Sequence, residues 1–537
     1  MSAPDPDGTA ALDVRDPDHD PSASYALDPA RVRQLTSVVL STSGESKRSV
    51  SPVNGQPLGD IPQSSEEDVA EAFRRARRAQ EAWARTSIEE RSAMFMRLHD
   101  LVLDRQDEIL DLICWESGKA RKHALDEPLH IALTARYYAR VAREQLATKR
   151  VPGLVPVLTH AEVNRVPKGV VGIIAPWNYP FTLALCDGLP AIMAGNAVVS
   201  KPDSQTPLTA LIGVELMREA GFPDDLWQVV TGRGSVVGTA IIERADYVCF
   251  TGSTATGRTI AQQCGERLIG CSLELGGKNP ILILRDADLD RAAEGAVRAA
   301  FSNAGQLCVS MERMYVADQV YDRFMQKFVD RINAMSLGAG LDWGIDMGGL
   351  ISQDQLDTVR RHVDEAKSMG ARVLTGGRHR PDLAPYFFEP TVIEGTTPEM
   401  ACFGEESFGP VISVYRFHDE NEAVARANNG DYGLNASIYS RDTSRARELA
   451  KRIKCGTVNI NEAFGATFAS LAAPMGGMRE SGMGRRQGAE GMWRYTETQS
   501  VAVQKVLRLS PMLGMSDETY AKVMTASVRL LTKLGRK

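Results

Sequence analysis

The sequence predicts an α/β protein built around a doubly wound, mostly parallel sheet. From Val163 onward, short β-branched runs alternate with helix-like segments, which is the pattern of βαβ units. Polar or glycine-containing stretches follow three of the predicted strands, at the sheet edge where such folds bind ligands. The 537 residues exceed a single core and correspond to about three domains.

The composition favours a soluble globular protein that acts on small molecules. Hydrophobic residues make up 43% and charged residues 24% of the chain, and the formal charge of −6 offers no basic surface for nucleic acid. The eight cysteines are scattered without a C-x-x-C pair, so we expect reduced thiols and no metal site. We expect a cytoplasmic location because there is neither a signal-peptide pattern nor a long apolar run.

The first part of the chain consists of a polar segment followed by a segment with a helical pattern. Residues 1–28 are rich in Asp, Pro, Ala and Ser, and we predict that they are disordered. Apolar residues recur at helical spacing from about Ser64 to Thr148, after a capping-type start at Ser64-Ser65-Glu66-Glu67. A second helix is predicted from Ser87.

The next part contains the main sheet. We expect its strands at 169–175, 197–200, 226–230, 247–250 and 272–275. Helices are expected between them at 181–194, 207–220, 235–244 and 254–268. This layout is typical of a dinucleotide-binding domain.

A second α/β pattern begins after Pro280. Strands are predicted at 281–284 and 314–316, and helices at 288–303, 321–334 and 353–369. Glu274 then ends the first sheet while Cys308 belongs to the second part. We therefore expect the two residues to meet at a domain interface, where sites are common.

Glu274 and Cys308 are candidates for a general base and a nucleophile. A thiol attacks only as the thiolate, and a carboxylate can activate water to release a covalent intermediate. Taken singly, a cysteine such as Cys308 is more often a small buried hydrophobe, and a glutamate before two glycines, such as Glu274, is more often a solvated turn residue. The eight histidines lie outside any catalytic-looking motif, which counts against a Cys–His hydrolase.

Other strand ends carry candidate ligand groups. Asn178 lies between two prolines and could donate to an oxyanion, although a turn Asn is an equal alternative. Lys201 could reach a phosphate or a ribose hydroxyl, and Gly252-Ser253 could present N–H groups to a phosphate. Surface lysines and glycine turns are the ordinary explanations for such residues. The glycine-rich stretch around Gly234 lacks the G-x-G-x-x-G spacing and is a weak signal.

These motifs together resemble the aldehyde dehydrogenase superfamily over roughly residues 45–505. The motifs that carry the resemblance are Pro176-Trp177-Asn178, Lys201-Pro202, Gly252-Ser253-Thr254, Glu274-Leu275-Gly276-Gly277-Lys278, Gly305-Gln306-Leu307-Cys308 and Glu406-Ser407-Phe408-Gly409-Pro410. The resemblance implies a Rossmann-type cofactor domain, an α/β catalytic domain and a small oligomerisation arm. It places the cofactor domain at 29–144 and 169–276, the catalytic domain at 277–485, the arm at 145–168 and 486–505, and a helical tail at 506–537.

The resemblance also implies a mechanism. Cys308 would attack the aldehyde, Asn178 and the Cys308 N–H would hold the oxyanion, and Glu274 would activate water to hydrolyse the thioester. A carboxylate at position 274 favours hydrolysis over transfer to coenzyme A. The implied cofactor-binding residues are Trp177, Asn178, Lys201, Pro202, Asp203, Ser204, Gly234, Gly252, Ser253, Leu275, Glu406 and Phe408.

Cofactor preference is predicted from Ser204. Similar NAD-preferring members usually carry Glu at this place, where it binds the adenine ribose and would repel a 2′-phosphate. Ser204 and Lys201 could accept that phosphate, so we expect NADP, with NAD as the alternative.

The substrate is predicted from the overall sequence pattern of the chain. That pattern, including the stretch 473–482, is similar to the sequences of a divergent second type of bacterial succinate-semialdehyde dehydrogenase. The better-known members bind the distal carboxylate with arginines, whereas the comparable places here hold Asp187 and Ser302. Another aliphatic or aromatic aldehyde is the alternative substrate, and a catalytically silent binding protein is the alternative of a different class.

The arm implies a homodimer or homotetramer. The tail after Lys505 carries basic residues among apolar ones, and we expect a helix packed on the enzyme. Contact with an acidic membrane surface is the less favoured alternative.

Overall fold

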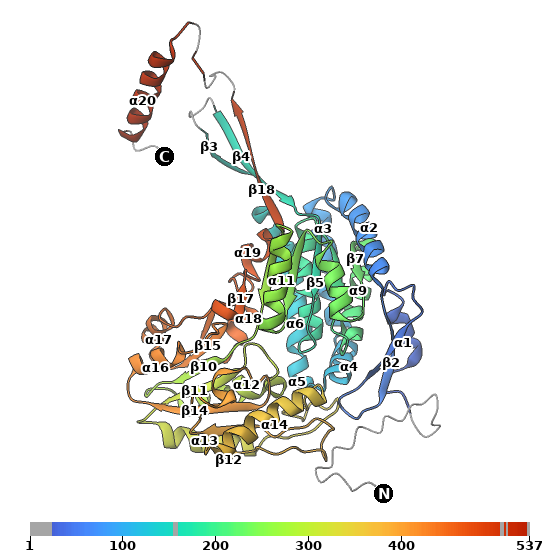
Figure 1. Cartoon of the computed structure of the whole chain (residues 1–537), viewed down its shortest axis with the longest axis vertical. Coiled ribbons are helices and arrows are strands. Elements are labelled where there is room, and N and C mark those ends of the chain that lie inside the picture. Colours follow the sequence, from blue (N-terminus) through green and yellow to red (C-terminus); the bar gives the residue numbers. More distant parts are fainter. Residues whose placement is uncertain (1–23, 154–158, 505–509, 512–513, 534–537) are drawn as a thin grey trace.

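We describe the fold from a computed structural model, which describes residues 24–153, 159–504, 510–511 and 514–533. Of the residues 1–28 predicted to be disordered, 1–23 lie outside these ranges. Residues 24–28 have a defined conformation, because Ala26 N donates to Pro57 O at 3.0 Å and Asp28 caps the first helix. Two sheets, each covered by helices, form two lobes, and a narrow antiparallel sheet projects from the first lobe (Figure 1). The chain crosses from the first lobe to the second at residues 275–278.

The first lobe is built on a six-stranded sheet with the order β17-β9-β8-β5-β6-β7. Its strands are β5 (Val170–Ile174), β6 (Ala197–Lys201), β7 (Trp227–Val229), β8 (Tyr247–Thr251), β9 (Gly270–Glu274) and β17 (Gly482–Met483). All neighbours are parallel except β17, which pairs antiparallel with β9. The chain winds from β5 to β6 and β7, then returns to β8 and β9 on the other side of β5. The predicted doubly wound sheet is confirmed.

Helices pack on this sheet. They are α1 (Pro29–Thr36), α2 (Glu66–Trp83), α3 (Ile88–Asp104), α4 (Gln106–Ser117), α5 (Arg121–Ala124), α6 (Asp126–Gln145), α9 (Pro207–Glu219) and α11 (Thr254–Glu266). Two of the predicted starts are confirmed as capping boxes, at Ser65 with Asp68 and at Ser87 with Glu90. A hairpin of β1 (Ser46–Val50) and β2 (Pro57–Pro62) precedes α2.

Two predicted helices of this lobe are divided in the structure. The helix expected at 181–194 is formed by α7 (Pro180–Leu185) and α8 (Gly188–Met193), with Asp187 at the break. The Asp187 carboxylate is held there by two arginines from the C-terminal part of the chain. The helix expected at 235–244 begins as a π-helical turn, η2 (Gly234–Gly238), and continues as α10 (Thr239–Ile242).

The second lobe contains a seven-stranded sheet with the order β12-β13-β14-β11-β10-β15-β16. Its strands are β10 (Asn279–Ile283), β11 (Met311–Ala317), β12 (Arg372–Thr375), β13 (Thr391–Glu394), β14 (Val411–Phe417), β15 (Asn435–Tyr439) and β16 (Thr457–Ile460). Only the pairing of β12 with β13 is antiparallel. The main helices are α12 (Leu289–Phe301), α13 (Tyr321–Asn333), α14 (Gln353–Ser368), α16 (Glu420–Ala427) and α17 (Thr443–Ala450).

Short helices connect the remaining strands. They are η1 (Asp224–Leu226), η3 (Ser302–Gly305), α15 (Ala401–Gly404), α18 (Gly465–Ala469), η4 (Arg479–Ser481) and α19 (Gly488–Trp493). The helix predicted at 288–303 therefore ends at Phe301. Asn303 and Ala304 have positive φ angles of 52° and 53°, so the chain turns sharply before Cys308.

The projecting sheet contains β3 (Lys149–Pro152), β4 (Thr159–Pro167) and β18 (Thr496–Gln504). Every residue of β18 except Thr496 is exposed. These strands fall in the segments predicted to form an oligomerisation arm, a role that stays a prediction.

The tail forms α20 (Asp517–Lys533), which lies beyond the arm in Figure 1. None of its residues is buried, so the expectation that it packs on the enzyme is wrong. Its apolar residues alternate with basic and acidic ones and find no partner layer among the described residues. No helix in the described ranges has the length and apolarity needed to cross a membrane.

Candidate functional site

The candidate residues gather at the carboxyl ends of the first sheet. The winding direction reverses between β5 and β8, and ligands of doubly wound folds bind at this switch point. Trp177 and Asn178 follow β5, Gly252 and Ser253 follow β8, and Glu274 ends β9. The predicted strand ends therefore lie along one edge, facing the second lobe.

The two predicted catalytic segments touch. A β-carbon at Gly277 would lie 2.6 Å from the carbonyl oxygen of Cys308, so only glycine fits there. Two residues later, Asn279 Nδ2 donates to the carbonyl oxygens of Cys308 and Ser310, both at 2.7 Å. The stretch after Glu274 thus fixes the backbone that carries the thiol.

A second set of amide bonds fixes the other side of the Cys308 loop. Asn303 Nδ2 donates to the carbonyl oxygens of Asn178 (3.0 Å) and Gln306 (3.1 Å). Asn178 Nδ2 donates to the Gln306 carbonyl at 3.1 Å, and Ile351 N donates to Gln306 Oε1 at 3.0 Å. An amide nitrogen carries two hydrogens, so Asn178 keeps one for another acceptor. Sequence reasoning assigned no role to Asn279, Asn303 or Gln306, although all three lie in the quoted motifs or directly beside them.

Cys308 is half-buried, and its surroundings disfavour the thiolate. Burial, followed by the negative charges of Glu274 and Glu406, raises its pKa to about 12. The protein groups alone therefore do not stabilise the thiolate that nucleophilic attack requires. Ionisation of this thiol requires loss of a neighbouring negative charge or arrival of a positive one.

Glu274 has the properties of a general base. It is 5% exposed, and burial raises the pKa of its carboxyl to about 7, an effect that Asp187 increases and Arg486 opposes most strongly. Its Oε1 atom has no hydrogen-bond partner among the described residues. A carboxyl that titrates near neutrality and keeps one oxygen free is suited to accept a proton from water.

A buried charge cluster lies behind Glu274. Arg486 donates to both oxygens of Asp187, at 2.9 and 2.7 Å, and to Thr251 Oγ1 at 3.0 Å. Arg494 donates to Asp187 Oδ1 at 2.6 Å. Thr251 is the register partner of Glu274 in the neighbouring strand, which brings the Arg486 guanidinium close to the base. Sequence reasoning missed both arginines; an Asp within the apolar run 181–194 was the only available signal.

Replacing Arg486 with Gln should shift the pH dependence of turnover. Loss of this cation removes stabilisation of the Glu274 carboxylate, so the pKa rises and the ascending limb of kcat moves to higher pH by about one unit. Steady-state rates from pH 5.5 to 9 measure the limb. The exposed Arg441→Gln variant is the control and should keep the native profile. An unshifted limb in a folded Arg486→Gln variant would show that the cluster is only structural.

The residues around Lys201 form the first part of a candidate cofactor site. Lys201 is buried, burial lowers its pKa, and Nζ donates to its neighbour's carbonyl, Pro202 O, at 3.1 Å. Asp203 Oδ1 accepts from Gln205 N at 2.9 Å, and Ser204 is exposed. Position 204 therefore offers a hydroxyl to solvent where a carboxylate would repel a phosphate.

Glu406 and Phe408 form the second part. Gly277 N donates to Glu406 Oε1 at 2.8 Å, and burial raises the pKa of this carboxyl to about 8, with Glu312 adding to the rise. The Phe408 ring meets the Trp177 ring edge-on, with centroids 5.5 Å apart. Glu312 accepts from Phe408 N at 3.0 Å, which holds Phe408 at its positive φ of 48°.

The remaining predicted cofactor residues have different surroundings. Ser253 caps α11 by accepting from Thr256 N at 3.3 Å, so its hydroxyl has a structural partner. Leu275 packs against Gly257, where a β-carbon would lie 2.5 Å from its side chain. Gly234 is exposed, and a β-carbon there would meet nothing within 4 Å, so nothing in the structure requires glycine at that place.

These groups fit a dinucleotide. Three kinds of group lie along the switch-point edge. They are the buried ammonium of Lys201, the aromatic pair of Trp177 and Phe408, and the carboxyl of Glu406, which accepts from a backbone N–H. Carboxyl groups bind ribose hydroxyls, and an ammonium binds hydroxyl or phosphate oxygens. The N-terminus of α11 adds backbone N–H groups at the same edge.

Comparisons with known proteins agree with this geometry. The sequence model of the Aldehyde dehydrogenase family matches residues 39–501. A protein of Mycolicibacterium smegmatis named "Putative succinate-semialdehyde dehydrogenase NADP(+)" is 51% identical over 95% of this chain and 99% of its own length. The Escherichia coli succinate-semialdehyde dehydrogenase NADP(+) GabD is 34% identical over 86% of this chain and 95% of its own. A betaine aldehyde dehydrogenase of Staphylococcus aureus, solved in complex with NAD+, matches with a TM-score of 0.83 and 31% identity over 90% of this chain and 99% of that chain.

Proposed function

The chain belongs to the aldehyde dehydrogenase family, and we propose that it oxidises succinate semialdehyde to succinate with NADP+ as the electron acceptor. The observation that carries the hydrolytic outcome is the Glu274 carboxyl, which keeps an unpartnered oxygen and titrates near pH 7 beside the Cys308 loop. The names of two relatives support the substrate and the cofactor. The protein is proposed to act in the cytoplasm as a homodimer or homotetramer assembled through the arm.

The first chemical step is assigned to Cys308. The thiol proton passes to solvent water, and the sulfur then adds to the aldehyde carbon, which forms a thiohemiacetal. The second N–H of Asn178 and the Cys308 backbone N–H are proposed to donate to the new oxyanion. NADP+ supplies a hydride acceptor when it is bound. Loss of hydride from the thiohemiacetal leaves a thioester on Cys308.

The second step is assigned to Glu274. Its carboxylate takes a proton from water, and the resulting hydroxide attacks the thioester carbonyl. Breaking of the carbon–sulfur bond releases the acid and returns the thiolate of Cys308. The Arg486–Asp187 pair is proposed to keep Glu274 ionisable in its buried position.

The cofactor is proposed to contact both lobes. Lys201, Pro202, Asp203 and Ser204 would lie at the adenosine end, with Gly234, Gly252 and Ser253 near the phosphates. Glu406 and Phe408 would bind the second ribose and pack beside the nicotinamide, together with Trp177 and Leu275. NAD remains the alternative, since the Staphylococcus aureus neighbour was solved with NAD+.

An aldehyde panel tests the proposal. Initial rates are measured with succinate semialdehyde, butanal and benzaldehyde, each with NADP+ and with NAD+. The proposal predicts the highest kcat/KM for succinate semialdehyde with NADP+. A neutral aldehyde that matches or exceeds succinate semialdehyde would favour the second candidate, a dehydrogenase for aliphatic or aromatic aldehydes.

Replacing Ser204 with Glu should reverse the cofactor preference. The new carboxylate repels a 2′-phosphate and accepts hydrogen bonds from unmodified ribose hydroxyls. We expect the ratio of kcat/KM for NADP+ to that for NAD+ to fall by about 10-fold or more. Ser204→Ala is the matched control and should change the ratio much less. A native enzyme that uses NAD+ as well as NADP+ would overturn the predicted preference.

A further inference from the structure

A cavity of ≈ 760 Å³ opens beside the C-terminal end of α12. Arg298 and Ser302 line it from α12 and η3, and Asp126 and Glu462 line it from other segments. The Arg298 guanidinium lies over the Phe464 ring, 5.3 Å from its centroid.

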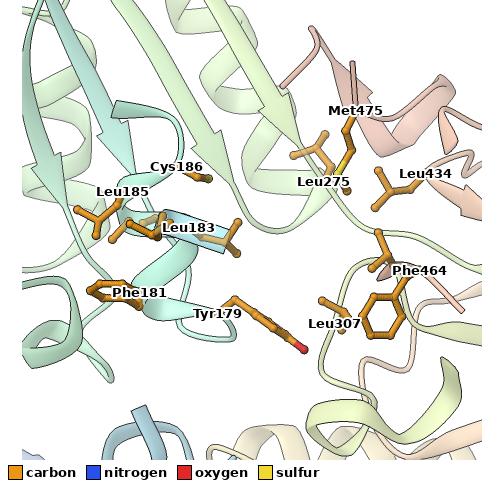
Figure 2. Packing of buried hydrophobic residues seen from close by; sticks show 14 of the residues in the cluster. Tyr179, Phe181, Leu183, Leu185, Cys186, Leu275, Leu307, Leu434, Phe464 and Met475 are labelled. Carbon is orange, nitrogen blue, oxygen red and sulfur yellow. The ribbon is translucent and has the colours of Figure 1, made fainter. Parts of the chain in front are cut away.

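Tyr179 connects this cavity with the reactive thiol. Its hydroxyl end points toward Leu307, the residue before Cys308, and toward Phe464 (Figure 2). The Tyr179 hydroxyl interacts electrostatically with Cys308 and also with Asp126 and Arg298 of the cavity. Ser302, six residues before Cys308, lines the cavity, so the cavity adjoins the segment that leads into the Cys308 loop.

Two buried hydroxyls in this region have no partner among the described residues. Ser302 is 2% exposed and Tyr179 is 3% exposed, and neither hydroxyl oxygen makes a hydrogen bond there. Of the two, Ser302 lines the cavity, so its hydroxyl is available to a group bound there. A hydroxyl can donate to a carboxylate oxygen.

Among the described residues of the cavity, Arg298 and Arg331 are arginines whose nearest carboxylates lie beyond hydrogen-bond distance, and the one on the same segment as Ser302, four residues before it, is Arg298. Its side chain is 47% exposed, and its nearest carboxylates, on Asp126 and Glu462, lie at 3.8 and 3.6 Å, beyond hydrogen-bond distance. By contrast, Lys122 is paired with Asp346, and Arg291 donates to Asn461 O at 3.0 Å. The planar fork of Arg298 can therefore bind a carboxylate with two parallel hydrogen bonds.

We propose that Arg298, assisted by the hydroxyl of Ser302, binds the distal carboxylate of succinate semialdehyde. This assignment rests on the proposed function. It supplies a cation for the distal carboxylate, a role that Asp187 cannot fill because its side chain is a carboxylate held by Arg486 and Arg494. Asp126 and Glu462 attract the guanidinium electrostatically without hydrogen-bonding to it. Burial raises the pKa of Asp126, which eases its protonation when a second carboxylate arrives.

The test compares Arg298→Gln with the native enzyme on two aldehydes of equal length, succinate semialdehyde and butanal. We expect KM for succinate semialdehyde to rise about 10- to 100-fold, the size of a lost charge-assisted interaction, with KM for butanal unchanged or lower. Arg298→Lys should recover part of the loss, and Ser302→Ala should raise the same KM by a smaller factor. Arg331→Gln, on the cavity wall, is the matched control and should leave both KM values unchanged.

The outcomes separate this assignment from the proposed function. If the native enzyme does not discriminate between the two aldehydes, the proposed substrate is wrong. If it does discriminate and Arg298→Gln keeps the full discrimination, the substrate stands and the role of Arg298 is refuted. An equal loss on both aldehydes, or an equal effect of Arg331→Gln, also refutes it, because a carboxylate anchor affects only the substrate that carries a carboxylate.

Discussion

The Cys308→Ala variant is expected to oxidise aldehydes at least about 1,000-fold more slowly than the native protein, because no other group can form the covalent intermediate. Stopped-flow measurement should show neither a burst of reduced cofactor nor steady turnover. Binding of NADP+, followed by quenching of protein fluorescence, should persist, because Cys308 contributes no predicted cofactor contact.

Cys271→Ala is the matched control for this variant. Cys271 is the other half-buried cysteine, and it lies in β9 three residues before Glu274. Its removal should leave the rate near the native value. Substantial turnover by Cys308→Ala would contradict the covalent mechanism, and inactivation by Cys271→Ala in a folded protein would transfer the assignment to that thiol.

The Glu274→Gln variant should form the thioester but release it slowly. We expect the burst of reduced cofactor to remain while steady turnover falls about 100-fold or more, the usual contribution of a general base. Rapid mixing separates the two phases. Glu405→Gln, which changes an exposed carboxylate near the same site, is the control. Loss of the burst together with turnover would mean that Glu274 acts before the thioester forms.

The same residue should govern the pH dependence of native turnover. The base works only as the carboxylate, and the pKa of Glu274 lies at about 7, so kcat should rise with pH through neutrality and level off above it. The Gln variant should lose this rise because an amide does not titrate. A native profile that is flat between pH 6 and 8 would exclude Glu274 as the limiting base.

Local pattern was sufficient to predict most of the first lobe. The five strands predicted there lie within a few residues of β5 to β9, because buried parallel strands consist of short β-branched runs with turn residues at both ends. The break near Asp187 has a local signal, because Pro190 has no N–H to donate to the Cys186 carbonyl. The ion pair of Asp187 with Arg486, 299 residues away in the chain, could not be predicted from the sequence. The capping boxes, by contrast, depend only on neighbouring residues.

The site residues that belong to a sequence motif could be predicted. Those whose role depends on tertiary packing could not. Cys308, Glu274 and Asn178 lie in recognisable motifs, and the structure brings them to one edge. Arg486 belongs to no motif, and its effect on Glu274 depends on burial. The raised pKa of Cys308 has the same origin, since the effect of burial is larger than that of the nearby cation Arg486. The exposed α20 shows the limit of pattern arguments, because an amphipathic segment does not reveal whether a partner surface exists.

Strand β17 has a consequence for the order in which the protein matures during synthesis. The first sheet lacks its edge strand until Gly482 and Met483 have left the ribosome, and the pair of Gly482 with Glu274 forms only then. Arg486 follows directly, so the buried surroundings of the base are assembled after nearly all of both lobes. Contacts between such distant segments form late because long loops must close first. Nascent chains therefore carry the thiol of Cys308 well before they carry a finished hydrolytic pocket.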